Sequence, residues 1–117
     1  MNRPLIVATT AFLLLLPQLN NVDGAGPYDG AWTGTATSTA ERCKRAVVRL
    51  TVEGRVVLGQ ARFERDALNI NGTVDQDGAF GATIGFQLFR GQFTPDEFEG
   101  TFKTFDCEWK AALKRTR

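Results

Sequence analysis

The sequence predicts an all-β protein, folded as a small antiparallel up-and-down barrel of about seven or eight strands. Apolar and polar residues alternate along most of the chain after residue 30, which is the period of a strand with one buried face. Glycine, proline and aspartate interrupt the alternation at short intervals, as turns between consecutive strands require. Two widely separated cysteines, Cys43 and Cys107, would close the body with one disulfide.

Four strands are expected in the first half of this pattern. The alternation is clearest after residue 45, where Ala46, Val48 and Leu50 share one face and mostly polar residues share the other. Gly59 and Gly72 fall on inward rows, where a glycine lets a strand bend or admits a large neighbour. The expected strands cover residues 31–38, 46–53, 57–63 and 68–75.

Four more strands are expected in the second half. The last of them places Cys107 and Trp109 on its inward row. Turn residues at 53–54, 75–78 and 94–97 reverse the chain between strands. The expected strands cover residues 80–84, 86–93, 98–102 and 107–113. Since consecutive hairpins with one apolar face remove their open edges by closing, the sequence favours a barrel over an open sheet.

The N-terminal segment is typical of an export signal. Arg3 supplies a positive charge, residues 5–16 form an apolar run, and Pro17 ends it. Residues 1–24 are therefore interpreted as a signal peptide, and residues 25–117 as a single β-barrel domain in the periplasm or outside the cell. An uncleaved membrane anchor is disfavoured, because twelve residues are too few for a bilayer core that needs about 20. No membrane insertion is expected once the leader is removed.

The two cysteines favour a structural disulfide in an oxidising compartment. A reactive dithiol or half of a metal site is the alternative, but the pair lacks C-x-x-C spacing and the chain has no histidine.

The charges beside the cysteines suggest a register. Arg42 and Lys44 are basic, whereas Asp106 and Glu108 are acidic. If the two cysteine segments ran antiparallel, Arg42 would face Glu108 and Lys44 would face Asp106. The sequence thus predicts that an early segment lies against the last strand.

Catalytic chemistry is poorly represented. Besides having no histidine, the chain has a single serine, Ser38, and its cysteines are assigned to the disulfide. No enzyme activity, metal or cofactor is therefore expected. The net charge is +1, which gives no electrostatic reason to expect nucleic acid as a partner.

The function hypothesis is an exported, non-enzymatic binding or interaction module whose partner is an unknown protein. One alternative is a carrier of a small apolar ligand, and another is an inhibitor of an exported protease. An eight-stranded barrel is filled by its side chains or holds one small ligand. Aromatic side chains are expected to fill the centre, and four of them are the candidates for lining a ligand: Trp32, Trp109, Phe63 and Phe102.

Several short motifs resemble small exported β-barrel proteins of proteobacteria. They are the opening Tyr28-Asp29-Gly30-Ala31-Trp32-Thr33-Gly34, the hairpin at Val52 to Val56, the turn at Gly72 to Gly78, and the closing Cys107-Glu108-Trp109. Lipocalin-like and avidin-like meander barrels share the Gly30-Ala31-Trp32 opening. The resemblance implies a periplasmic or secreted barrel, and it carries over no functional residue because most members lack an assigned activity.

Export should remove the leader after Gly24, so the mature protein should begin at Ala25. Intact-mass spectrometry of the exported protein checks this cut, and cuts near Leu19 or at Gly26 are the alternatives. Retention of Met1 in the exported protein would show instead that the leader is an uncleaved anchor.

Overall fold

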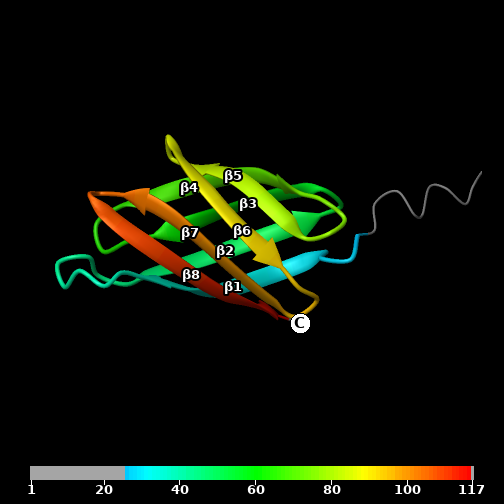
Figure 1. Ribbon diagram of the computed structural model, residues 1–117, viewed down its shortest axis with the longest axis horizontal. Coiled ribbons are helices and arrows are strands. Elements are labelled where there is room, and N and C mark those ends of the chain that lie inside the picture. Colours follow the sequence, from blue (N-terminus) through cyan, green and yellow to red (C-terminus); the bar gives the residue numbers. More distant parts are fainter. Residues whose placement is uncertain (1–25, 117) are drawn as a thin grey trace, which may run out of the picture.

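The computed structural model describes residues 26–116, in which eight antiparallel strands form a closed barrel (Figure 1). Each strand pairs with the next, and the last pairs with the first, so the predicted up-and-down barrel is confirmed. The strands are β1 (Gly30–Thr37), β2 (Ala46–Glu53), β3 (Val56–Arg62), β4 (Ala67–Val74), β5 (Ala79–Ile84), β6 (Gln87–Phe93), β7 (Glu97–Thr104) and β8 (Cys107–Thr116).

The expected signal peptide, residues 1–24, lies outside the described part of the chain. Between residues 26 and 116 there is no helix long and apolar enough to cross a membrane.

Barrel closure brings the two ends of the domain together. Trp32 of β1 lies directly opposite Arg115 of β8, and both belong to the inward rows of their strands. The Arg115 guanidinium sits 4.9 Å from the centre of the Trp32 ring, a cation–π contact. Arg115 also donates a 2.6 Å hydrogen bond to the carbonyl oxygen of Pro27. These contacts fasten Pro27 and β1, at the start of the described residues, to the last strand.

Aromatic side chains fill the interior. Phe80, Phe89, Phe93, Phe98 and Phe102 are all at most 4 % exposed, and they meet mainly edge to face. Such ring pairs stabilise by about 0.5–1.5 kcal/mol beyond the burial of their area. The expectation that aromatic rings occupy the centre therefore holds for these five.

Two glycines make room for this packing. Gly91 of β6 lies opposite Gly100 of β7. A Cβ atom on Gly91 would stand 2.5 Å from the Phe98 ring, and one on Gly100 would stand 2.7 Å from it. The paired glycines thus leave the space that the Phe98 ring occupies.

The disulfide joins Cys43 to Cys107, as predicted, but the register predicted around it is wrong. Cys43 lies in the connection between β1 and β2, which is not part of any strand ladder, because β1 and β7 already occupy both edges of β8. Arg42 Nη2 donates a 2.7 Å hydrogen bond to the carbonyl oxygen of Asp106 instead of facing Glu108. Glu108 forms its ion pair with Lys103, at 3.6 Å.

Lys44 does not pair with Asp106 either. Within residues 26–116 the only ion pair is the one between Lys103 and Glu108. The early segment that lies against the last strand is β1 itself.

Two phenylalanines expected in the interior lie outside it. The strand expected from residue 86 begins at Gln87, which leaves Phe86 in a turn, and Phe105 lies in the turn before β8. Both are exposed.

Replacing both cysteines, as Cys43→Ser with Cys107→Ser, should lower the free energy of unfolding by about 4 kcal/mol. The bridge closes a loop of 64 residues and so restricts the unfolded chain. Urea unfolding measures the loss, and reduced wild-type protein is the control that should match the variant. A loss below about 1 kcal/mol would contradict this account of the bridge.

Candidate functional site

In an up-and-down barrel, successive connections alternate between the two ends. Four connections consequently gather at one end, which we call the disulfide end (the left in Figure 1). They are residues 38–45, 63–66, 85–86 and 105–106. The first and last described residues lie at the opposite end.

The disulfide end carries exposed aromatic side chains. Phe86 is fully exposed, at 103 % of the reference area, and Phe105 is 49 % exposed. Leu88, two residues after Phe86, is 54 % exposed. Fully exposed aromatic side chains on turns are more typical of interaction sites than of folding requirements.

The turn that carries Phe86 is fastened to the neighbouring strand. Gly85 has a positive φ of 59°, which glycine adopts without strain. Its N–H donates a 3.1 Å hydrogen bond to the carbonyl oxygen of Asn69, and Leu68 lies against it. The two-residue turn therefore holds the Phe86 backbone in one position while the ring stands in solvent.

The turn that carries Phe105 has an unusual backbone. Phe105 and Asp106 have φ angles of 55° and 59°, in the left-handed region that side chains other than glycine rarely adopt. Three contacts hold the turn: the hydrogen bond from Arg42 to Asp106, the disulfide at Cys107, and the Phe63 ring, whose centre is 5.1 Å from that of Phe105.

The sequence pattern missed Phe86 and Phe105 as surface residues. One signal could have located them. The inward-facing residues have even numbers in β5, up to Ile84, and odd numbers in β6, where Phe89 faces inward. The same change from even to odd numbers occurs between Phe102 of β7 and Cys107 of β8. A two-residue hairpin turn produces this change. The residues before and after such a turn lie directly opposite each other and share a face, but their numbers differ by three, so one is even and the other odd.

Three of the four predicted lining residues come together beneath the disulfide end. The Phe63 ring centre lies 5.1 Å from that of Trp109 and 6.5 Å from that of Phe102. Phe102 and Trp109 are each 3 % exposed, whereas Phe63 is half-buried. With Phe105 and the disulfide, Phe63 and Trp109 line a depression of about 260 Å³ that opens at this end.

Trp32 lies apart from the other three, near the opposite end. Its ring contacts Phe93 at 4.8 Å, and its Nε1–H donates to the carbonyl oxygen of Tyr28 at 2.9 Å. The Nε1–H of Trp109 likewise donates to Thr104, at 3.1 Å. Both indole N–H groups are thus satisfied within the fold, and ligand contact by the four aromatic residues stays a prediction.

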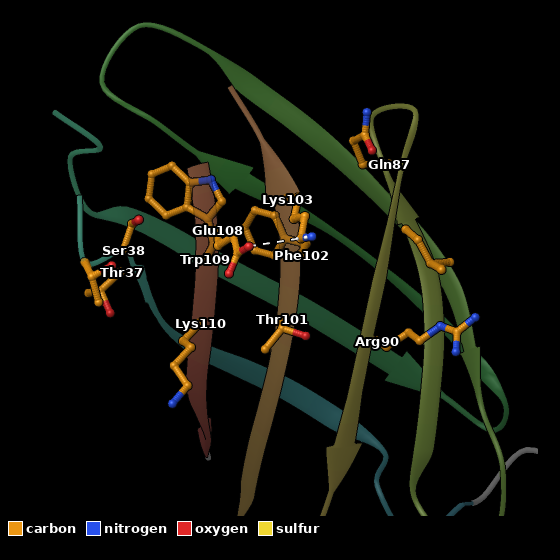
Figure 2. A pocket seen from close by; sticks show the side chains of 12 residues that line it. Thr37, Ser38, Gln87, Arg90, Thr101, Phe102, Lys103, Glu108, Trp109 and Lys110 are labelled. Atoms are coloured by element: carbon orange, nitrogen blue, oxygen red, sulfur yellow. Dashed lines mark ion pairs between the residues drawn. The ribbon is translucent and has the colours of Figure 1, made fainter. Parts of the chain in front are cut away.

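A larger depression of about 600 Å³ opens on the barrel wall beside the disulfide end (Figure 2). It lies over the outer faces of β6, β7 and β8 and the end of β1, and the exposed Lys103–Glu108 ion pair bridges β7 and β8 within it. Within residues 26–116, no three histidine, cysteine or acidic side chains come together in a group that could hold a metal ion.

Asp106→Gly should stabilise the protein by about 1 kcal/mol, because glycine removes the cost of a left-handed residue. Arg42 contacts only the backbone oxygen there, so its hydrogen bond should survive. Thermal unfolding measures the change. Asp96→Gly, in a turn without a positive φ, is the control and should give no gain. Equal effects of the two substitutions would contradict the assignment of strain to Asp106.

No protein-family model matches this chain, and neither a curated protein nor a solved structure matches it.

Proposed function

We propose that this protein is an exported, non-enzymatic binding module that docks a protein partner at the disulfide end of its barrel. In this proposal the Phe86 side chain enters an apolar pocket of the partner. The observation that carries the proposal is a fully exposed phenylalanine on a turn tied to the rigid sheet.

The energetics favour Phe86 as the anchor. Burying a phenylalanine side chain from water contributes about 1.5–3 kcal/mol, and buried aromatic anchors often dominate interface energies. The hydrogen bond from Gly85 to Asn69 fixes the turn before binding. Little backbone order is then lost on docking, which lowers the entropic cost of association.

The surroundings of Phe86 suit the rim of an interface. Exposed residues of both signs occupy the other connections at this end, among them Arg42, Glu64, Arg65 and Asp66. A polar rim around an apolar centre is the usual anatomy of a protein–protein interface, and mixed charges favour a partner with complementary charges.

Export is part of the proposal. It is supported by the expected leader at residues 1–24 and by the disulfide, which persists in oxidising compartments. The resemblance to small exported β-barrel proteins of proteobacteria agrees with a periplasmic or secreted location.

Phe86→Ser should weaken capture of the partner at least tenfold, because the ring contributes its burial energy only in the complex. The experiment immobilises the mature protein and measures stoichiometric capture from envelope extract and from culture fluid of the source organism. Leu58→Ser is the matched control, since Leu58 is an outward apolar residue of β3 that is 51 % exposed.

Wild-type protein and the Leu58→Ser variant should capture the same partner to the same extent. Absence of any stoichiometric partner, or equal capture by the Phe86→Ser variant, would overturn the proposal.

A further inference from the structure

One lateral row of outward side chains crosses four strands of the barrel wall. Arg90 of β6 lies opposite Thr101 of β7, Thr101 opposite Lys110 of β8, and Lys110 opposite Thr37 of β1. All four are exposed. With strands about 4.8 Å apart, the row spans about 14 Å.

This row is the middle of a long groove. The depression beside the disulfide end and a second one of about 600 Å³ share all four of these residues. The first extends from the row toward Ser38 and Lys103, and the second extends along the strands toward Glu99 and Ala112. The two depressions therefore adjoin at this row, and together they form the groove over β1, β6, β7 and β8.

The groove has a low floor between two long cationic side chains. Thr35, Thr101 and Ala112 are the short outward residues of the floor. Arg90 and Lys110 lie on either side of Thr101, and both side chains point away from it (Figure 2). A ligand lying over Thr101 would have Arg90 on one side and Lys110 on the other.

Among the described residues neither Arg90 nor Lys110 forms an ion pair, although two carboxylates, Glu99 and Glu108, also line the groove. Within residues 26–116 the only ion pair joins Lys103 to Glu108, so Arg90 and Lys110 have no carboxylate within 4.0 Å. The cross-strand neighbours of Arg90 are Thr101 and Gly81, and nothing lies within 4 Å of the position a Gly81 Cβ would take. The Arg90 guanidinium is thus open to a ligand from the β5 side as well.

We infer that this groove binds an acidic polysaccharide, with Arg90 and Lys110 holding its carboxylate groups. The planar arginine fork matches a carboxylate in two parallel hydrogen bonds, and lysine adds a point charge. The hydroxyls of Thr37, Ser38 and Thr101 supply donors and acceptors for sugar hydroxyls along the same line. The groove lies on the wall beside the disulfide end, and Phe86 is not among its lining residues.

The lining argues against nucleic acid as the occupant. Single-stranded nucleic acids stack their bases on exposed aromatic rings. The aromatic residues that line the groove, Phe102 and Trp109, are each 3 % exposed and pack inside the barrel.

Binding to polygalacturonate at physiological ionic strength tests the inference, with neutral dextran as the uncharged probe. Wild-type protein should bind polygalacturonate and not dextran. The double variant Arg90→Gln with Lys110→Gln should bind at least tenfold more weakly. Arg49→Gln with Arg62→Gln is the matched control, because it removes the same charge from exposed positions on β2 and β3 and should change binding less than twofold.

Three results would overturn the inference: no binding of polygalacturonate, equal weakening by both double variants, or tighter binding of a single-stranded DNA oligonucleotide that depends on Arg90 and Lys110. The Phe86→Ser variant should bind polygalacturonate as wild type does. Polygalacturonate binding by this variant tests the groove independently of Phe86, so one of the two proposals can be disproved while the other stands.

Discussion

Closure of the barrel is the constraint on which the rest of the structure depends. A strand at the edge of an open sheet leaves its N–H and C=O groups without partners. Here β8 pairs with β7 on one side and with β1 on the other, so neither of its edges is open. The Cys43 segment has no strand edge to join, and it is therefore a loop at the end of the barrel that the disulfide joins to the start of β8.

Because aromatic side chains fill the interior, the candidate binding residues are those on the outside of the barrel. The central rings contact one another, and their burial is explained by folding alone. Folding does not require a fully exposed Phe86, nor a groove on the wall that Arg90 and Lys110 flank. A rigid scaffold lets such side chains meet a ligand without first becoming ordered, which is the physical basis of both binding proposals.

Much of the fold was predictable because burial alternates locally along each strand, as the strictly alternating Ala46–Glu53 shows. The disulfide was predictable because the chain has only two cysteines. The ion pairs around it were not, since they depend on which strands flank β8. The exposure of Phe86 was missed because phenylalanine is apolar and was therefore expected in the interior. The wall groove joins residues of four strands, and their register follows from turn lengths and closure rather than from any one segment.

An even number of strands has a practical geometric consequence. Since the chain crosses the barrel eight times, Gly26 and Thr116 lie at the same end, and the turn carrying Phe86 lies at the other. A label, a solid support or a fused domain attached through either terminus would therefore leave the aromatic turns facing solution. Two copies joined tail to tail would present their Phe86 rings in opposite directions, as a bivalent reagent for bridging two partners.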